Sequence, residues 1–519
     1  MKRWETPALW RWLVVAAALS FIPGLFLPYI GEEAVYTIST LEMWHAHDLS
    51  NPLIYGAVYG RPPFLNWIML PLAELLGVQH VLIASRIVTA VSTILTGAAL
   101  FGLGRYLGID RRHAWLAVLT FLSSDALLYH GWLAYADPLF GLLTFAAMSC
   151  ILVAARRQNV ALLIAASLFT IAAFLTKALT AYVFVAIVWL VAYVRHREAR
   201  LTLVKPAALL SYALAIAVPI VWYSFNHTAA VGAQGSLMVA DIANKLRPDS
   251  LREWLSQVVT FPLETFCRFL PVSLIVIYKY VRQRSTPQPA TNQWEGTIAW
   301  ATLLNFLPYW LAPSSSIRYI LPIYPMIAFC LGGYLSRIDL RTLRVAVGCI
   351  SVAVALKYIA MVWAFPAYEV RYRGDAAAVA KDILYATQDA PLYIDDSSSA
   401  GLTIAANIDQ MRWPAAPITF PLAESRDGWI ITRHADAAGR TLVRDYWLGG
   451  DHVYLVCSGR DCATSGPQPD VKGPSRTTVP LVRDENRRPG DLRLSSVKAS
   501  GRITGTANVK KISVDSRTG

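Results

Sequence analysis

The sequence predicts an all-α polytopic membrane protein with about eleven transmembrane helices, followed by a small C-terminal α/β domain outside the membrane. Of the 519 residues, 55% are hydrophobic and only 16% are charged, whereas about 25% of the residues in a typical soluble domain are charged. Apolar runs long enough to cross about 30 Å of hydrocarbon recur through the first 365 residues. After residue 365 the pattern changes to shorter helical and alternating segments.

The predicted transmembrane domain covers residues 1–365 and holds eleven apolar runs. The first is read as a retained span, because no small-residue cleavage pattern follows it. The runs are 8–28, 81–104, 114–131, 135–154, 160–176, 178–194, 206–224, 262–281, 297–312, 317–335 and 343–364.

Basic residues fix the predicted orientation of these spans. With a cytoplasmic N-terminus, every predicted inner segment carries at least two Arg or Lys side chains, as the positive-inside rule requires. The apolar segment 62–79 would reverse all later loops if it crossed, so we expect it to lie along the outer surface or to re-enter it. Residues 29–80 are then the first outer loop. The positive-inside rule does not account for charged residues on the outer side, so their presence there needs another explanation.

A small α/β domain is predicted over residues 366–462, with helices in "GDAAAVAKDILYATQD" and "SSAGLTIAANIDQM" and strands in "APLYIDD", "GWIITRH" and "HVYLVCSG". Residues 463–519 are polar and are expected to be mostly disordered. Cys457 and Cys462 are close in sequence and could form a disulfide in an oxidising periplasm. The net charge of +13 comes without a nucleic-acid-binding motif, so no nucleic-acid partner is expected.

Two adjacent carboxylates, Glu32 and Glu33, follow the first apolar run in "GEEAVYTISTLEMW". This segment is predicted to be an amphipathic helix at the outer surface. Acids at a membrane edge can simply be solvated, but acids beside an anion site suit general base work on a hydroxyl group. The aromatic and proline-rich surroundings favour the second interpretation and leave either carboxylate as the base.

Three cations are predicted to reach the same outer face. Arg61 precedes two prolines in "YGRPPFLNW", which stiffen the backbone around a group suited to bidentate phosphate binding. Lys177 lies in a short turn between two runs, and Arg318 stands beside Tyr319 at the start of the tenth run. Each cation could instead extend to lipid headgroups, although the orientation rule calls for no basic residue there.

A further acid, Asp137, opens the fourth apolar run directly before a proline. It could be a plain helix N-cap, but ionisable groups at membrane depth are also candidates for function. In the outer loop 225–261, the lone His227 is expected to be solvated rather than a metal ligand.

The order of these motifs resembles that of the GT-C-fold glycosyltransferases that use polyprenyl-phosphate sugars, namely the protein O-mannosyltransferases and the bacterial transferases that add aminoarabinose to lipid A. In that family an Asp-Glu pair follows the first span, where this chain has Glu32 and Glu33. A Y-x-K-P-P segment corresponds to "YGRPP", which begins at Tyr59. The other correspondences are an acid at the fourth span, a Thr-Lys pair and an R-Y-x-L-P-x-Y-P stretch, matched by Asp137, Thr176–Lys177 and Arg318–Pro325.

The resemblance implies a hexosyl- or pentosyltransferase of the bacterial inner membrane. It would move a sugar from a polyprenyl-phosphate donor to lipid A, an envelope glycan or a protein on the periplasmic side, with inversion. Membrane lipids would surround it, and the C-terminal domain would be periplasmic. The implied catalytic residues are Glu32, Glu33 and Asp137, the implied phosphate ligands are Arg61, Lys177 and Arg318, and the implied substrate-binding residues are Tyr59 and Tyr319.

Two departures from the family pattern bear on this implied chemistry. Glu32 replaces the usual aspartate and is one methylene longer. Gly60 stands where the aminoarabinose transferases have a glutamate that helps to bind metal, so a divalent metal ion is the one candidate cofactor and would lack that ligand. A transporter or flippase for lipid-linked sugars is the alternative function, but it would need symmetric broken helices or charges deep in several spans. A non-catalytic scaffold would tolerate alanine at Glu32 and Asp137.

Overall fold

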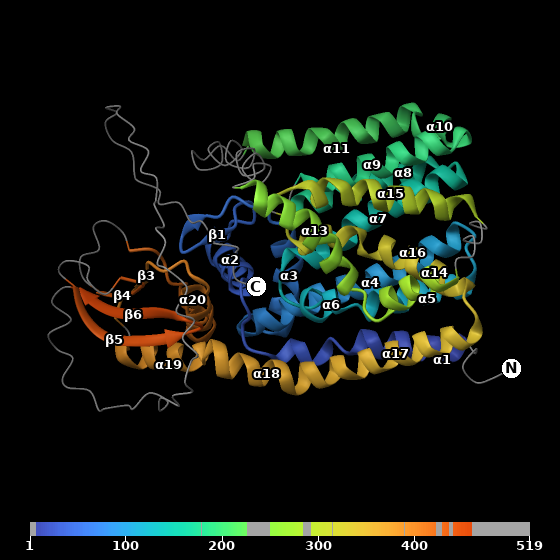
Figure 1. The fold of residues 1–519 in the computed structure, drawn as a ribbon. Helices are drawn as coiled ribbons and strands as arrows, with labels where there is room; N and C mark the ends of the chain where they lie inside the picture. The colour runs from blue at the N-terminus through green and yellow to red at the C-terminus, as the bar shows by residue number, and fades with distance from the viewer. Residues whose placement is uncertain are drawn as a thin grey trace.

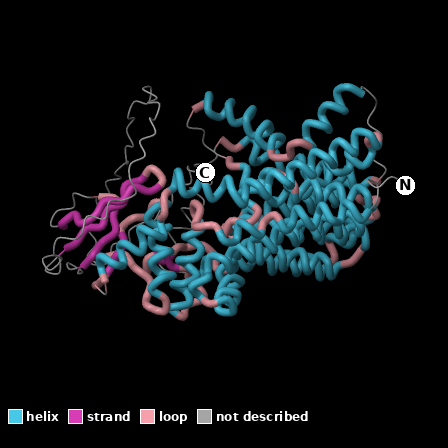
Figure 2. The backbone as a smooth tube through the Cα atoms, turned by 90° about the horizontal axis from the view of Figure 1, so that it is seen from below, coloured by secondary structure: helices cyan, strands magenta, loops and turns pink. Residues whose placement is uncertain are grey.

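The computed structural model describes residues 7–177, 179–225, 250–283, 292–313, 315–388, 390–421, 428–434 and 440–458. A bundle of helices forms most of the molecule, and a small sheet lies at one end of it (Figure 1). The view from below shows the strands gathered at the end away from the N-terminus (Figure 2).

The bundle follows the apolar runs of the sequence, and each of the eleven predicted ranges contains helix. Its helices are α1 (Pro7–Leu19), α4 (Val81–Tyr106), α5 (Arg111–Leu122), α6 (Asp125–His130), α7 (Ala136–Arg157), α8 (Val160–Thr176), α9 (Thr180–Arg195), α10 (Arg197–Leu203), α11 (Pro206–Phe225), α13 (Leu251–Cys267), α14 (Val272–Gln283), α15 (Gln293–Leu311), α16 (Tyr324–Arg337) and α17 (Leu340–Ile359). Short 3-10 segments η2 (Ile22–Phe26), η3 (Val78–His80) and η4 (Ile317–Ile323) precede α2, α4 and α16.

The chain is a multi-pass membrane protein. Six helical stretches within the described residues are long and apolar enough to cross a membrane, and α13 and α14, bent by 104° at their junction, would form a seventh. The apolar helices α8 and α9 are shorter. The count of eleven spans therefore stays a prediction, while the helical, apolar character of the ranges is confirmed.

Helix α7 lies at the centre of the bundle, packed against α4, α8, α9 and η4. It is apolar nearly all round, as expected of a helix buried among other helices, and most of its side chains are buried. Asp137 in its first turn is therefore held at a fixed place at one end of the bundle.

The last bundle helix continues beyond the bundle through two π-helical stretches, η5 (Ala360–Ala364) and η6 (Glu369–Arg373), and the short α18 (Phe365–Tyr368). Together, residues 340–373 make 34 helical residues, or about 51 Å at 1.5 Å per residue. That length exceeds the hydrocarbon core of about 30 Å. The helix thus carries the following residues away from the bundle, along its lower edge in Figure 1.

The C-terminal α/β segment, residues 376–458, contains two helices and a four-stranded sheet in the order β3-β4-β6-β5. Strands β3 and β4 are parallel, and the other pairs are antiparallel. Each of the five predicted elements contains the predicted type of structure, although the strands in "APLYIDD" and "GWIITRH" cover only three and five residues, Leu392–Ile394 and Gly428–Thr432. The strand β5 was missed. The elements are α19 (Ala376–Thr387), β3 (Leu392–Ile394), α20 (Ser399–Arg412), β4 (Gly428–Thr432), β5 (Arg440–Leu448) and β6 (Asp451–Ser458).

Helix α2 (Glu33–Ala46) is buried, and the prediction of an amphipathic surface helix is wrong. All residues from Glu33 to Met43 are buried, because α20 and α3 pack on α2 from outside while α4 packs on it from the bundle. Trp44 at its end contacts Trp413, which follows α20, with 4.5 Å between ring centroids. The first outer loop is thus enclosed between the bundle and the C-terminal α/β segment.

Helix α3 (Phe64–Leu76) lies within the apolar segment 62–79. Its 13 residues extend about 20 Å, which is too short to cross the hydrocarbon core. Asn66, the polar residue within it, donates hydrogen bonds to Ser39 Oγ (2.8 Å) and Thr40 Oγ1 (2.9 Å) of α2. The amide therefore fastens α3 to α2, as suits a segment that packs on the outer loop.

Buried carboxyl groups anchor a small hairpin, β1 (Leu53–Ile54) and β2 (Ala57–Val58), between α2 and the C-terminal α/β segment. Glu42 of α2 accepts hydrogen bonds from the backbone N–H groups of Tyr55 (2.5 Å) and Gly56 (2.8 Å). The Tyr55 hydroxyl donates to the carbonyl of Asp396 (3.2 Å). Asp409 of α20, also buried, accepts from Ile418 N (2.9 Å). The hairpin thus links residues more than 300 positions apart in sequence.

This junction is expected to be less stable in alkaline solution. Burial raises the pKa of Glu42 from 4.5 to about 8 and that of Asp409 from 3.8 to about 7, so the folded state keeps protons that the unfolded state loses. Their contribution to stability is full below about pH 4 and is lost as pH rises through 7 and 8. Glu42→Gln should flatten this loss at its alkaline end, at the cost of one backbone acceptor. Hydrogen exchange at Tyr55 and Gly56, followed from pH 5 to 9 after correction for the intrinsic rate, would contradict this account if the variant and the parent lost protection alike.

Candidate active site

Glu33, the second acid of the predicted pair, is fully buried at the start of α2. Its Oε1 accepts hydrogen bonds from Arg86 Nε and from Ala134 N, both at 2.8 Å. Its Oε2 accepts from Arg86 Nη2 at 2.5 Å and from Ile30 N at 2.8 Å. A carboxylate has about four acceptor positions, and all of them are filled. This geometry makes Glu33 a structural link and leaves no position on it for a substrate proton.

Arg86 was missed in the sequence, although its position was informative. It lies inside the apolar run 81–104, and a charged residue within a span usually has a specific partner. Besides Glu33, its guanidinium donates to the carbonyls of Gly24 (3.0 Å) and Pro28 (2.7 Å). Arg86 thus fastens the loop that precedes Glu32 to α4.

Glu32, the first acid, lies at the N-cap position of α2 with its side chain partly accessible. Its carboxylate Oε2 is 3.4 Å from Nη1 of Arg318 in η4. Its backbone N–H donates to the hydroxyl of Tyr135 at 3.1 Å, so the backbone is held while the carboxylate reaches into the site.

Asp137 and Lys177 form a direct ion pair between the first turn of α7 and the residue after α8. The N-cap of α7 is Tyr135, so the plain capping role considered for Asp137 is not what the structure has. Lys177 Nζ also lies 5.2 Å from the ring centroid of Tyr319, and the guanidinium of Arg318 lies 5.6 Å from the same ring. Tyr319 therefore connects the two predicted cations through its aromatic face.

Arg61 approaches the same site from the first outer loop. Its Nη1 donates to the hydroxyl of Tyr36 in α2 at 3.0 Å, and its guanidinium lies 5.0 Å from the ring centroid of Tyr59. Burial raises the pKa of both phenols, so they stay neutral. The charges of Glu32 and Asp137 both act on Arg61, yet within the described chain Arg61 forms no ion pair. Arg61 is an exposed residue, so an anion can approach it.

The structure brings together Glu32, Arg61, Asp137, Lys177, Arg318 and the two tyrosines Tyr59 and Tyr319, whereas Glu33 faces Arg86 behind them. Three cations and two carboxylates leave one positive charge, 3 − 2, in the cluster. Tyr36, which orients Arg61, was not predicted, because only its hydrogen bond reveals its role. The cluster lies at the end of the bundle nearest α2. It combines a surplus of positive charge with one ion-paired but partly accessible carboxylate, that of Glu32.

A divalent metal does not fit this donor set well. Among the described residues, no group of three or more His, Cys, Asp or Glu side chains is placed to hold a metal ion, and the two carboxylates of the cluster are each paired with a cation. His227, considered as a ligand, lies outside the described residues. We therefore derive no chemical step through a metal.

Of the two cysteines in the predicted disulfide, only Cys457 lies within the described residues. Cys457 is disulfide-bonded and buried in β6 opposite Trp429 and Thr441. Its predicted partner Cys462, and the tail 463–519, lie outside the described residues. The four cysteines of the bundle are free.

Comparisons with known proteins bear on the family and the fold. Residues 60–223 match the family model of the dolichyl-phosphate-mannose-protein mannosyltransferases. No curated protein matches the sequence. The crystal structure of ArnT from Cupriavidus metallidurans bound to undecaprenyl phosphate superposes with a TM-score of 0.65 at 16% identity, over 89% of this chain and 100% of that chain. The apo state of the same protein gives a TM-score of 0.63 at 16% identity, over 89% and 99%. The chain thus has the GT-C fold, and its resemblance to the GT-C-fold polyprenyl-phosphate-sugar glycosyltransferases is confirmed.

Proposed function

We propose that this protein is an inverting glycosyltransferase of the bacterial inner membrane that moves a sugar from a polyprenyl-phosphate donor to an acceptor on the periplasmic side. The acceptor would be a hydroxyl or phosphate group of lipid A, of an envelope glycan or of a protein. One observation carries the proposal: Glu32, a partly accessible carboxylate, lies in contact with Arg318 in a cluster with a surplus of positive charge. The fold and the matched family model support the same reaction class.

The three cations are assigned to the donor phosphate. Arg61 forms no ion pair within the described chain, and one of its guanidinium nitrogens donates to Tyr36, while Lys177 and Arg318 both lie near the ring of Tyr319. As the bond between the anomeric carbon and the phosphate oxygen breaks, its electron pair stays on the phosphate. Fixed cations in a site of low dielectric stabilise that growing charge. The undecaprenyl phosphate bound by ArnT supports a polyprenyl carrier for this chain too.

Glu32 is assigned as the general base. The acceptor oxygen attacks the anomeric carbon from the face opposite the leaving phosphate, and its proton passes to the Glu32 carboxylate. A single displacement of this kind inverts the anomeric centre. When the donor binds, Arg318 would turn from Glu32 to the donor phosphate. Donor binding would then leave the Glu32 carboxylate available to accept the proton. Asp137 then serves to hold Lys177, Glu33 serves to fix the loop before Glu32, and Tyr59 and Tyr319 line the donor site.

Lys177→Met should weaken donor binding. Loss of one charge-assisted contact is worth roughly 1.5–3 kcal/mol, or about 10- to 100-fold in the Kd for undecaprenyl phosphate. In the double variant Asp137→Asn/Lys177→Met, no buried carboxylate is left without its partner. Comparison with Lys177→Met therefore separates the loss of the cation from the effect of the unpaired Asp137 carboxylate. Lys381→Met, at an exposed lysine of α19, is the control. An unchanged Kd in both Lys177 variants would remove Lys177 from the phosphate site.

The reaction class is tested with the purified protein in nanodiscs, a polyprenyl-phosphate donor labelled in its sugar, and the lipid A, glycan and protein fractions of the envelope as acceptors. We expect label in one acceptor fraction, with the anomeric configuration inverted. In sealed vesicles, movement of labelled donor across the bilayer without any transfer would instead establish a flippase.

A further inference from the structure

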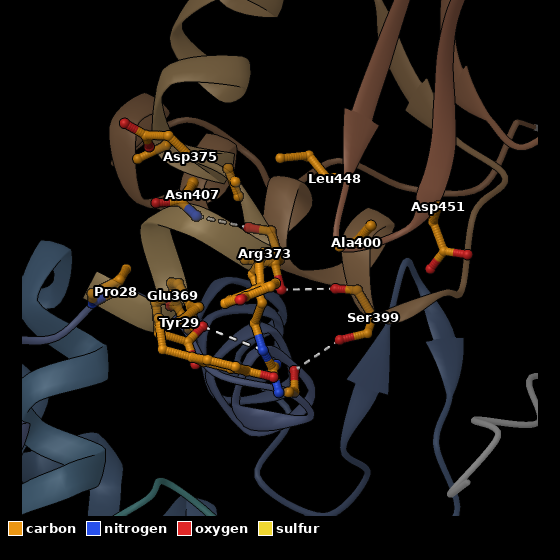
Figure 3. A pocket seen from close by; sticks show the side chains of 18 residues that line it. Pro28, Tyr29, Glu369, Arg373, Asp375, Ser399, Ala400, Asn407, Leu448 and Asp451 are labelled. Carbon is orange, nitrogen blue, oxygen red and sulfur yellow. Dashed lines mark hydrogen bonds and ion pairs between the residues drawn. The ribbon is translucent and has the colours of Figure 1, made fainter. Parts of the chain in front are cut away.

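A cavity lies beside the loop that carries Glu32, and Pro28, Tyr29 and Gly31 of that loop line it. Its volume is about 590 Å³, within the range of about 300–1,000 Å³ that is usual for small-molecule sites. The cavity is lined by residues 28, 29 and 31, by residues 368–377 from the end of the long helix to the start of α19, by α20, and by residues around the turn between β5 and β6 (Figure 3). It is therefore enclosed by the bundle end on one side and by the C-terminal α/β segment on the other.

One face of α20 gives this cavity a polar stripe. Ser399, Thr403 and Asn407 recur every four residues and all line the cavity, while Leu402, Ala405 and other residues of the opposite face are buried. The hydrogen bonds of Thr403 and Asn407 stay within the helix. Thr403 Oγ1 donates to the Ser399 carbonyl (2.7 Å), and Asn407 Nδ2 donates to the Thr403 carbonyl (2.8 Å). Within the described residues, the amide oxygen of Asn407 has no partner, so it is free to accept from a ligand.

Aromatic and charged groups complete the lining. Tyr368 and Tyr372 line the cavity and are exposed, with ring centroids 4.9 Å apart and ring planes inclined by 35°. Arg373, paired with Glu369 at 3.3 Å, is the guanidinium at the centre of Figure 3. With Asp375 and Asp451, the lining has three carboxylates against one guanidinium. That balance disfavours an anion, whereas hydroxyl-rich ligands match carboxylate and amide acceptors on one side and aromatic faces on the other.

The cavity is coupled to the proposed base through the backbone. Ser399 Oγ donates to the carbonyl of Gly31 at 3.4 Å, and Gly31 immediately precedes Glu32. Gly31 has φ +60°, and a Cβ there would lie 2.5 Å from the Tyr135 hydroxyl, so no other side chain fits. A ligand in the cavity would thus contact the loop backbone that positions Glu32, without occupying the cation cluster.

We propose that this cavity is a saccharide subsite, which binds a sugar ring of the acceptor other than the ring that receives the transferred sugar. This inference rests on the proposed glycosyl transfer. Uniform binding of a remote part of a substrate lowers KM without changing kcat, and Gly31, next to Glu32 in sequence, lines this cavity. The C-terminal α/β segment would then contribute directly to acceptor choice.

The test fills the cavity from α20. Asn407→Trp is compared with Met411→Trp. The second variant introduces the same side chain at an exposed position one turn further along the helix, outside the lining of the cavity. The probe is a panel of methyl glycosides of neutral hexoses and of hexosamines, observed by saturation-transfer difference NMR on the full-length protein. We expect ring-proton signals with the parent and with Met411→Trp, and loss of these signals with Asn407→Trp. Binding of undecaprenyl phosphate should be the same in all three.

Persistence of the glycoside signals in Asn407→Trp, or their absence in the parent, would overturn the subsite. Thr403→Phe repeats the test if Asn407→Trp does not fold. With the envelope acceptor, the filled cavity should raise the acceptor KM about tenfold with kcat little changed. An unchanged acceptor KM in a protein that transfers sugar normally overturns the subsite and leaves the proposed transferase activity intact. Glycoside binding in a protein that transfers no sugar overturns both the transferase activity and the role of the cavity in binding an acceptor.

Discussion

Glu32→Gln is expected to lower the rate of sugar transfer by about 10²- to 10⁴-fold, the usual contribution of a general base, while donor binding stays equal or becomes slightly tighter. The amide keeps the size of the side chain but cannot take the acceptor proton. It also releases Arg318, now 3.4 Å from the carboxylate, for the phosphate. Single-turnover transfer and undecaprenyl phosphate titration measure the two effects separately.

The matched control is Glu74→Gln, at an exposed carboxylate of α3 that accepts from Trp44 Nε1 and lies outside the cation cluster. It should transfer at the parent rate. Transfer at the parent rate by Glu32→Gln would remove Glu32 from the chemistry, and a parallel loss of donor affinity would mean that the carboxylate only supports the site's structure.

Arg86→Met is expected to destabilise the protein by about 3–5 kcal/mol, because it leaves the buried Glu33 carboxylate without its partner. Both side chains are fully buried, and the guanidinium also holds carbonyls of the loop before α2. Adding Glu33→Gln to Arg86→Met should recover part of the loss, since the orphaned charge is removed. The free energy of unfolding in mixed micelles, measured for the single and double variants, checks this coupling.

Arg268→Met is the control for Arg86→Met. Arg268 pairs with Asp125 at 2.7 Å, but both side chains are about a third to a half exposed, so its removal should cost only about 0–1 kcal/mol. Equal losses in the two variants would contradict the structural role assigned to the Glu33–Arg86 pair. Such a result would also reopen Glu33 as a catalytic candidate.

The bundle could be predicted from the sequence because each helix is apolar over its own length. Hydropathy therefore gave eleven ranges that each contain helix, although it missed α10 and the first part of α13. The burial of α2 could not be predicted in this way, since it depends on α20, which follows more than 350 residues later. Strand β5 was missed because "RTLVRDYWL" is rich in charge. Its strand is set by pairing with β6 rather than by its own pattern.

The candidate site divides in the same way. Charges placed against the orientation rule pointed to Arg61, Lys177 and Arg318, and these do converge. The sequence could not separate Glu32 from Glu33, which differ only in direction: one carboxylate faces Arg318 and the other faces Arg86. Nor could it show that Asp137 pairs with Lys177, because that contact depends on how α7 and α8 pack.

The most direct test of sugar transfer by Glu32 is mass spectrometry of the lipid A, glycan and protein fractions from cells that lack the gene and are complemented with the parent or with Glu32→Gln. We predict that one fraction carries an added hexose or pentose mass with the parent gene, and that this mass is missing both without the gene and with Glu32→Gln at equal protein level. The same added mass in the Glu32→Gln cells, or in none of the fractions with the parent gene, would contradict the account.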